Sequence, residues 1–385
     1  MQGVAVWGTF LVLLSCSEPG SPESQRPPES WDLVAAVRIG SAAGADYPLQ
    51  RVLGLLPADD GSILVRQARS QELPVFGGEG ELVRVIGGRG EGPGEYLSID
   101  AMGWLGDTLW VGDWRLRRVT YQSAEGGFWS DAGYDVASLG VGLTSTSPFH
   151  LSGDWAATHP AVRVAMMDQI GLPVLMTDRN GRVLDTLSVW DRSSLMTRVV
   201  RGDRETPIFR PFLGMARAAS SPSGSYMAVL EPVVEPAGDT VKAVLKVWNA
   251  AGAQVLDRVL GRVSATVPEA SKSEWLDEQA SRLVQDPQEA APFRSQLENT
   301  VRIPERFGFA DALVVSDDGH IWIGLQLEAE GRVWWILNAE GRLLATTATP
   351  KGTELMAVGP TGVWGVMTDD LGINYIVRFD VINRG

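Results

Sequence analysis

The chain is patterned as short apolar strands separated by tight polar turns. Six of the turns join two strands in which apolar and polar positions alternate, the pattern of a half-buried strand pair. We name these pairs the inner hairpins, and their turns are residues 59–61, 106–107, 153–154, 222–224, 317–319 and 360–362. Six hairpins of one kind indicate a repeated unit.

An outer hairpin follows most of the inner ones. Its turn begins with Asp or Asn and ends with Gly in three of the four best copies, which suits a residue that bonds its own backbone and a residue with positive φ. The four turns are residues 77–80, 178–181, 249–252 and 338–341. Inner and outer hairpins together predict four-stranded antiparallel units.

The spacing of the units predicts the fold. Matching positions in the inner hairpins are 46, 46, 71, 95 and 42 residues apart, namely Ile63, Leu109, Trp155, Tyr226, Ile321 and Val363. Spacings in the forties are typical of propeller blades, and the two larger gaps must hold insertions. We predict an all-β, six-bladed propeller over residues 32–385. Two separate β domains are the alternative.

The last unit is short, because only one strand-like run follows its inner hairpin. An apolar run at residues 33–39 precedes the first unit. We expect that N-terminal strand to complete the last blade and remove its open edge.

The longer gap also contains a helical pattern. Ser271 and Glu274 have the spacing of a capping box, and Trp275, Leu276 and Leu283 follow at helical positions. Asp286 and Pro287 predict the start of a second helix. We expect a helical insertion over about residues 268–306, with its apolar side chains on the propeller rim and the helices over part of the central opening.

Residues 87–96, GGRGEGPGEY, form the most distinctive stretch. Six of the ten residues are Gly or Pro, which predicts a tight reversal. A phosphate-binding loop is a poor alternative, since Pro93 replaces the last glycine of GxGxxG and no helix pattern follows.

Together with the preceding strand, this stretch resembles a large bacterial family of six-bladed β-propeller lipoproteins related to the NHL-repeat propellers. The shared pattern is V-x-x-I-G-G-R-G-E-G-P-G-E-Y at residues 83–96. Leu109–Asp113 followed by Arg118 is similar to the NHL pattern of strand, Asp, short loop and Arg. The resemblance implies the fold and an envelope location more than an activity.

The N-terminus is typical of an exported lipoprotein. Residues 4–14 are apolar but too few to span a bilayer, and Leu13-Leu14-Ser15-Cys16 resembles a lipobox. We predict a signal peptide at 1–15, lipidation of Cys16 and a Pro- and Ser-rich tether at 16–31. Ser17 after the cysteine favours the outer membrane, and a plain secretory signal is the alternative.

Composition excludes several classes of function. The net charge is −14, which argues against nucleic-acid binding, and one cysteine excludes a disulfide framework. The three histidines, His150, His159 and His320, form no catalytic motif. We expect a monomer with no cofactor, although calcium is possible.

Function is expected on one face of the disc. In each blade, the loop between the second and third strands and the link to the next blade lie on the same side, which we name the link face; the other side is the turn face. All the long segments fall on the link face, where function concentrates. The predicted partner-binding residues are Arg89, Glu91, Asp113, Trp114, Arg115 and Arg118.

Two functions remain open. The first is a lipid-anchored scaffold that binds a protein, peptide or glycan without catalysis, or a permanent envelope component of the same kind. The second is a calcium-dependent lactonase or related hydrolase with the metal at the channel mouth. Its candidate ligands are Glu231, Glu235, Glu328, Asp369 and Asp370. An Asp113–Arg118 pair that only braces a loop is the structural alternative for that cluster.

Overall fold

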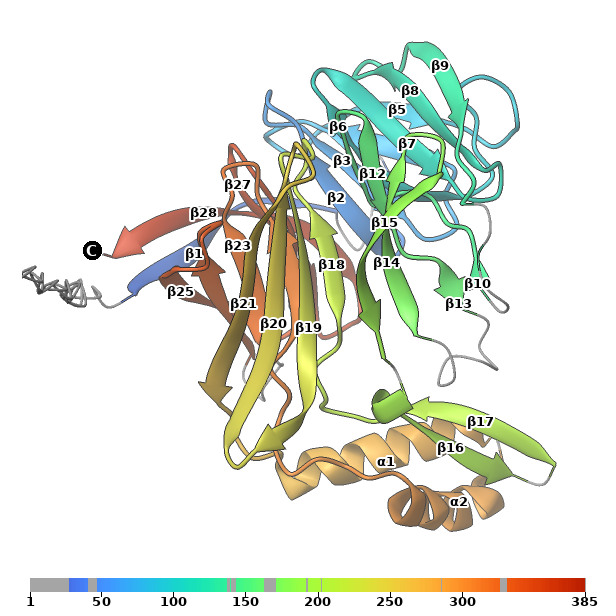
Figure 1. Ribbon diagram of the computed structural model, residues 1–385, viewed down its shortest axis with the longest axis vertical. Coiled ribbons are helices and arrows are strands. Elements are labelled where there is room, and N and C mark those ends of the chain that lie inside the picture. The colour runs from blue at the N-terminus through green and yellow to red at the C-terminus, as the bar shows by residue number, and fades with distance from the viewer. Residues whose placement is uncertain are drawn as a thin grey trace, which may run out of the picture.

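The computed structural model describes residues 28–40, 47–136, 139, 143–162, 171–191, 193–201, 203–284, 286–325 and 331–384. Its strands form four separate four-stranded antiparallel sheets and one eight-stranded sheet (Figure 1). The eight-stranded sheet consists of two four-stranded antiparallel units joined by a short parallel pairing, so the strands make six such units. In chain order, the first three are β2(Val52–Pro57), β3(Ile63–Gln67), β4(Glu72–Phe76), β5(Leu82–Gly87); β6(Ile99–Leu105), β7(Thr108–Asp113), β8(Arg118–Ser123), β9(Phe128–Gly133); and β11(His150–Ser152), β12(Trp155–Thr158), β14(Leu172–Asp178), β15(Val183–Trp190).

The other three units follow the same up-and-down order. They are β18(Arg217–Ser220), β19(Tyr226–Ala237), β20(Thr240–Asn249), β21(Gln254–Val263); β22(Ala310–Val315), β23(Ile321–Leu325), β24(Gly331–Leu337), β25(Leu343–Pro350); and β26(Thr353–Gly359), β27(Gly362–Thr368), β28(Asn374–Arg384), β1(Glu29–Ile39). A short pair, β10(Leu143–Thr144) and β13(Ala161–Val162), lies outside the units. The predicted four-stranded antiparallel propeller units are confirmed.

The N-terminal strand completes the last unit, as predicted. β1 pairs antiparallel with β28 over nine residue pairs, from Ser30↔Arg384 to Ile39↔Ile376. It begins at Glu29, earlier than the expected boundary at residue 32, because its first residues also contact the neighbouring fifth unit. Glu29 and Ser30 pair in parallel with β25, and the Trp31 ring lies 5.9 Å from that of Trp322.

The core lies between neighbouring units rather than within a separate layer. Between the first and second units, for example, the buried cluster contains Leu64, Val75, Tyr96, Leu109 and Val111. Inner strands with apolar side chains on both faces supply most of these residues, as expected for strands covered by a unit on each side. Three of the fourteen tryptophans, Trp322, Trp334 and Trp364, are among the largest fully buried side chains.

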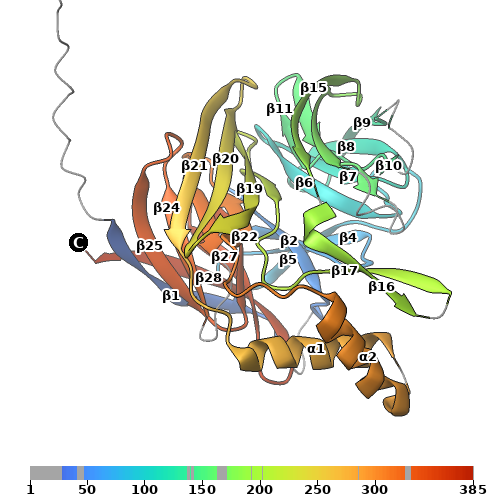
Figure 2. The same ribbon diagram turned by 60° about the horizontal axis from the view of Figure 1, so that its bottom comes forward.

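Two unit-to-unit links fold together into a subdomain on the link face (Figures 1 and 2). The link before unit four contributes a 3-10 turn, η2(Ser193–Leu195), and a hairpin of β16(Met196–Arg201) and β17(Arg204–Phe209). The link after unit four contributes α1(Glu269–Leu283) and α2(Pro287–Thr300). We name this assembly the insertion subdomain.

The helical insertion was predicted, but two of its details were wrong. α1 begins at Glu269 with Pro268 as its N-cap and no side-chain cap, so Ser271 and Glu274 form no capping box. Leu276 packs against Val199 and Ile208 of the β16–β17 hairpin, with Trp275 and Leu283 beside them, rather than on the propeller rim. The hairpin offers an apolar face that the helix pattern alone could not reveal.

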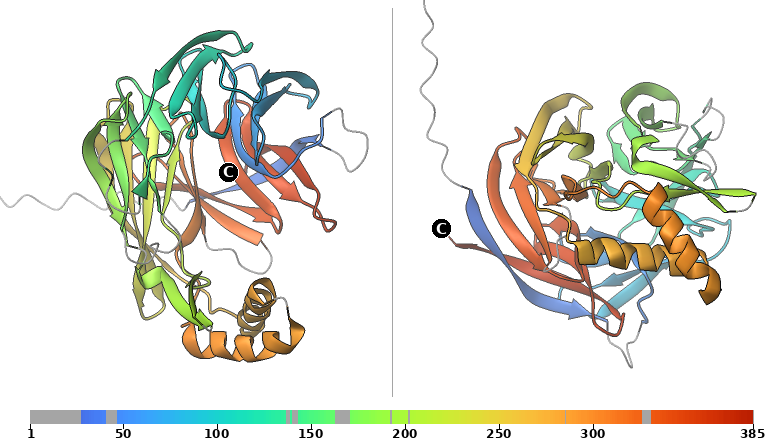
Figure 3. Two further views of the ribbon diagram at one scale, coloured as in Figure 1. Left: turned by 90° about the vertical axis from the view of Figure 1, so that its right-hand side faces the viewer. Right: turned by 90° about the horizontal axis from the view of Figure 1, so that it is seen from below.

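The helices do lie on the expected link face. Seen from that side, they stand in front of part of the ring of blades (Figure 3, right). The second helix starts as predicted, with the Asp286 carboxylate accepting a hydrogen bond of 2.9 Å from the Gln288 N–H.

Closure by β1 gives a first prediction. Ile39 is 2% exposed and packs between β1 and the first unit, so Ile39→Ala should lower the free energy of unfolding by about 2–4 kcal/mol. Val34 on the same strand is 47% exposed, and Val34→Ala should cost less than about 1 kcal/mol. Urea denaturation measures both. Equal effects of the two substitutions would contradict a buried closing strand.

Candidate functional site

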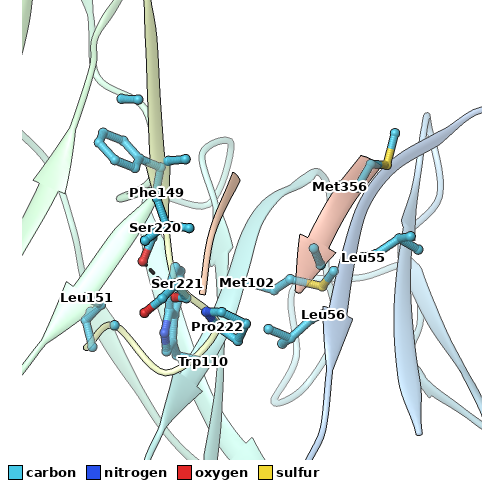
Figure 4. Close-up of a pocket in the computed structure, with 16 residues that line it drawn as sticks. Leu55, Leu56, Met102, Trp110, Phe149, Leu151, Ser220, Ser221, Pro222 and Met356 are labelled. Carbon is cyan, nitrogen blue, oxygen red and sulfur yellow. Dashed lines mark hydrogen bonds between the residues drawn. The ribbon is translucent and has the colours of Figure 1, made fainter. Parts of the chain in front are cut away.

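The six inner strands enclose a narrow central channel. A cavity of about 210 Å³ is lined by residues of all six units, among them Leu56, Met102, Leu151, Ser220 and Met356. Leu56 and Met102 point toward each other across it (Figure 4). The channel interior therefore offers a ligand mainly apolar side chains and the polar backbone of residues 218–222.

Charged side chains gather where this channel reaches the link face. The charges of these side chains act on one another: that of Arg66 acts on Asp100, and that of Glu354 acts on Arg217 and Arg332. Asp100, Arg217 and Glu354 each precede by two positions a residue that lines the channel. Arg66 near the end of β3, and Asp311 and Arg332 of unit five, lie at the same end of their strands. We name these six residues the channel mouth.

Two of the mouth arginines are held by carbonyl groups rather than by carboxylates. Arg66 lies across Gly54, where a Cβ would be 3.3 Å from its Nε, and donates from Nη2 to the Leu53 carbonyl at 2.9 Å. Arg217 donates from Nε to the Asp311 carbonyl at 2.7 Å. Within the described residues, neither forms an ion pair, and burial lowers the pKa of both. The charge of a nearby carboxylate partly offsets this effect, Asp100 for Arg66 and Glu354 for Arg217. Both are half-buried cations whose hydrogen bonds, among the described residues, go to carbonyl groups.

Arg332 differs from these two. Its guanidinium forms an ion pair with the Asp311 carboxylate and contacts the Leu325 carbonyl at 3.2 Å. Its donors are thus used within unit five, and it supports the mouth rather than offering a free charge.

Asp100 is an acid of the channel mouth whose pKa is raised. Burial raises its pKa, while hydrogen bonds from Ser147 and the charge of Arg66 lower it in part. Its Oδ2 accepts the Ser147 N–H at 3.3 Å, and its buried Oδ1 has no hydrogen-bond partner among the described residues. A carboxyl group in this setting is a candidate for contact with a ligand.

The predicted cluster on unit two forms the rim beside this mouth. Trp114 is 44% exposed and donates from Nε1 to Ser98 Oγ at 2.8 Å, two residues before Asp100. Arg115 is exposed, and with Trp114 it borders a surface pocket of about 390 Å³. These two residues lie where a partner could reach them.

Asp113 has a structural position instead. It is fully buried, and its Oδ2 accepts the N–H groups of Leu97 (2.6 Å) and Ser98 (3.0 Å). Its Oδ1 accepts those of Arg115 (2.9 Å) and Leu116 (3.0 Å). The carboxylate therefore joins the segment that precedes β6 to the turn that contains Trp114 and Arg115.

Arg118 organises the glycine-proline loop. Its guanidinium donates to the carbonyls of Glu91 (3.2 Å), Gly92 (2.9 Å) and Glu95 (2.6 Å) and pairs with Asp131 at 3.0 Å. The expected Asp113–Arg118 pair is therefore wrong, although both residues do brace loops. Three carbonyl groups of residues 91–95 approach the Arg118 guanidinium closely, and the tight backbone turn that this requires explains why the loop is rich in Gly and Pro.

The loop itself is a tight reversal, as predicted. Gly87 and Gly94 have φ values of +86° and +71°, and a Cβ on Gly87 would lie 2.9 Å from the buried Tyr96 ring. Arg89 and Glu91 are exposed on this loop, so both are accessible to a partner.

Those candidate calcium ligands whose side chains the structure describes, Glu231, Asp369 and Asp370, form no metal site. The described residues contain no group of three or more His, Cys, Asp or Glu side chains placed to hold a metal. Glu231 accepts bonds from Ser188 (2.6 Å) and Lys246 (3.1 Å), and Asp369 accepts two backbone N–H groups of its own turn. Asp370 is exposed, and Glu328 and the side chain of Glu235 lie outside the description.

A serine–histidine contact lies in the channel wall. His150 Nδ1 is 2.8 Å from Ser220 Oγ, and its ring centroid is 4.3 Å from that of Trp155. Burial lowers the pKa of His150 to about 3, which makes it a weak base at neutral pH. The contact joins units three and four and is a structural link.

Cys16, the predicted lipidation residue, lies outside the described residues. Of the helices that the structure does describe, none has the length and hydropathy needed to cross a bilayer.

Sequence reasoning identified the rim but missed the mouth. Arg66 and Arg217 are single charges in apolar strands and belong to no motif. A signal was available, since Asp100, Asp311 and Glu354 share the start of the inner strand in three units. It becomes visible only when the six strands are aligned in register.

Comparison with known proteins agrees with this architecture. Residues 46–103 match a family described as a six-bladed β-propeller. The match confirms the resemblance to six-bladed propellers. No curated protein matches the sequence.

Several solved structures are similar to this chain. A member of the duf4221 family from Bacteroides vulgatus is 9% identical with a TM-score of 0.47, over 92% of this chain and 99% of that one. A calcium-binding protein, regucalcin, from Agrobacterium tumefaciens is 12% identical with a TM-score of 0.41, over 92% and 97%. The PQQ-bound aldose sugar dehydrogenase from Streptomyces coelicolor is 11% identical with a TM-score of 0.43, over 93% and 100%.

The Arg118 contacts give a second prediction. Arg118→Met leaves three loop carbonyls and the Asp131 carboxylate without their partner, and should lower the free energy of unfolding by about 2–4 kcal/mol. Arg118→Lys should recover only part of this, because an ammonium lacks the planar fork. Urea denaturation and cleavage by a glutamate-specific protease at Glu91 and Glu95 measure the change. Arg115→Ala is the control and should stay within about 0.5 kcal/mol.

The buried histidine predicts a pH dependence. The pKa of His150 is about 3 in the fold against 6.5 as the ordinary value, so between these values the unfolded chain binds more protons. Stability from this group is therefore complete above pH 6.5 and falls by about 1.4 kcal/mol per pH unit below it. His150→Gln lacks this titration, so the stability difference between wild type and variant should shrink as the pH falls. Parallel pH profiles in urea denaturation would exclude a buried neutral His150.

Proposed function

We propose that this protein is a non-catalytic binding protein of the bacterial envelope. Its propeller holds a protein, peptide or glycan partner on the link face, and an acidic group of that partner binds at the channel mouth. The observation that carries this proposal is the pair Arg66 and Arg217, which are half-buried and bonded to carbonyls only.

The charge state of these arginines supports an anionic group. A guanidinium keeps its charge even when burial lowers its pKa, and it matches a carboxylate with two parallel donors. In the cavity behind the mouth, the side chains of Leu56, Met102 and Met356 would contact a short apolar part of the ligand, beside the polar backbone of residues 218–222.

The rim supports a larger partner than a small molecule. Trp114, 44% exposed, and Arg115 stand beside the mouth, and these residue types are enriched where protein interfaces have most of their binding energy. Arg89 and Glu91 extend the same surface along the glycine-proline loop.

An N-terminal lipid anchor belongs to the proposal. Cys16 in its lipobox-like context would carry the lipid, and the outer membrane is the expected location. β1 enters the propeller at the turn-face end, because it runs antiparallel to β28 and leads into the link before β2. The tether would therefore join opposite the proposed binding face.

A calcium-dependent hydrolase is the alternative. It predicts lactone hydrolysis that requires added calcium and stops when calcium is chelated, whereas a binding protein shows no such turnover.

The fourth prediction concerns partner capture. Lipidated full-length protein in envelope membranes should retain a partner, and Arg217→Gln, or Trp114→Ala with Arg115→Ala, should weaken its recovery at least about tenfold. Capture should also weaken with salt, because exposed charges are screened. Quantitative cross-linking and elution measure the bound fraction, with Cys16→Ala testing whether anchoring is required.

Matched controls lie away from this surface. Arg342 is an exposed arginine beside the 338–341 turn on the turn face, and Trp129 is a 55% exposed tryptophan on an outer strand. Arg342→Ala and Trp129→Ala should leave capture unchanged. Equal losses for the control and link-face variants would refute the assignment of the binding face.

A further inference from the structure

A second pocket lies where the insertion subdomain joins the propeller. Its volume is about 540 Å³, and its walls come from the β19–β20 hairpin and from the two links on either side of unit four. Pockets between structural units are common ligand sites. This pocket is separate from the central channel and shares no lining residue with it.

Two arginines meet in this pocket. Arg210 donates from Nη1 to the Ser194 carbonyl at 2.7 Å and from Nε to the Arg302 carbonyl at 3.0 Å. Burial and the charge of Arg302 both lower the pKa of Arg210, so the two cations repel each other. Carbonyl bonds fix the Arg210 guanidinium in place, while the Arg302 side chain is exposed.

No carboxylate neutralises these charges within the part of the chain that the structure describes. Glu305 also borders the pocket, but it forms no ion pair with either arginine. Arg306, the third arginine of the lining, bonds the Ser264 carbonyl. Neighbouring cations that no described carboxylate compensates favour an anion from outside at short range.

The remaining walls are apolar. Val233 is 43% exposed at the pocket, and Leu213 and Ile303 are half-buried beside it. Phe307 and Phe309 close the base. An inorganic anion would use only the arginines, whereas a ligand with an apolar body would use both parts of the pocket.

We propose that this pocket binds a small amphipathic carboxylate, with its carboxylate on Arg210 and Arg302 and its hydrocarbon part against Val233, Leu213 and Ile303. The ligand bridges the insertion subdomain and unit four, because its two ends contact different segments. This site goes beyond the partner surface proposed above and does not depend on it.

Calorimetric titration of the full chain with three probes tests the proposal. Octanoate should bind saturably at millimolar concentration or below. Acetate, which has only the head group, and octanol, which has only the chain, should each bind at least about tenfold more weakly. Equal binding of acetate and octanoate, or no saturable octanoate binding, would overturn the proposal.

Variants locate the site. Arg302→Gln removes an exposed side chain that makes no hydrogen bond of its own in the described structure, so the fold should be retained, and octanoate affinity should fall at least about tenfold. Val233→Asp should weaken octanoate similarly by placing a negative charge in the apolar wall. Arg342→Gln on the turn face is the matched control and should change nothing. An unchanged affinity in Arg302→Gln, with circular dichroism showing an intact fold, would refute the assignment.

Discussion

The pairing of β1 with β28 is the constraint on which the whole architecture depends. Without it, the last unit has three strands and an open edge. The first unit also loses the packing of Ile39 against its own buried side chains. Nine residue pairs join segments that are more than three hundred residues apart in the chain. Because the inner strands enclose a channel only when the ring is closed, the channel mouth exists as a consequence of this one ladder.

The same closure sets the direction in which the chain enters the propeller. β1 enters at the turn-face end and leaves toward the link face, like the fourth strand of every other unit. An anchor at Cys16 would therefore hold the turn-face side of the ring, and the rim residues Trp114 and Arg115 would point away from the attachment. In this proposal, anchoring and binding would use different surfaces.

The fold could be predicted from sequence because repetition amplifies weak local signals. One Asp-x-x-Gly turn is uninformative, but recurring turns at blade spacing define the strands, the faces and the closing strand. The insertion subdomain could be predicted only in part. Its helices are periodic, but the β16–β17 hairpin has a partner from a distant link, and no local pattern identifies such a partner.

The site was predictable to a smaller extent, for a different reason. Trp114 and Arg115 were found because they belong to a motif, and Asp113 and Arg118 in the same motif proved to hold the loops that carry them. Local sequence does not distinguish an arginine that braces a loop from one that offers free donors. That distinction depends on what the donors meet, and for Arg66 and Arg217 this is set by strands from other parts of the ring.

The negative net charge of the chain bears on how Arg66 and Arg217 could bind an acidic group. A surface of net charge −14 repels an anionic partner at long range, so it gives no electrostatic steering toward the link face. The proposed recognition of an acidic group would then come from short-range contacts, where donors fixed by carbonyl bonds lose little entropy on binding. The same reasoning applies to Arg210, which is fixed by two carbonyls in the subdomain pocket. Both places combine an arginine bonded to carbonyl groups with neighbouring apolar side chains. At the proposed sites, this arrangement would select for the geometry of a ligand more than for its charge.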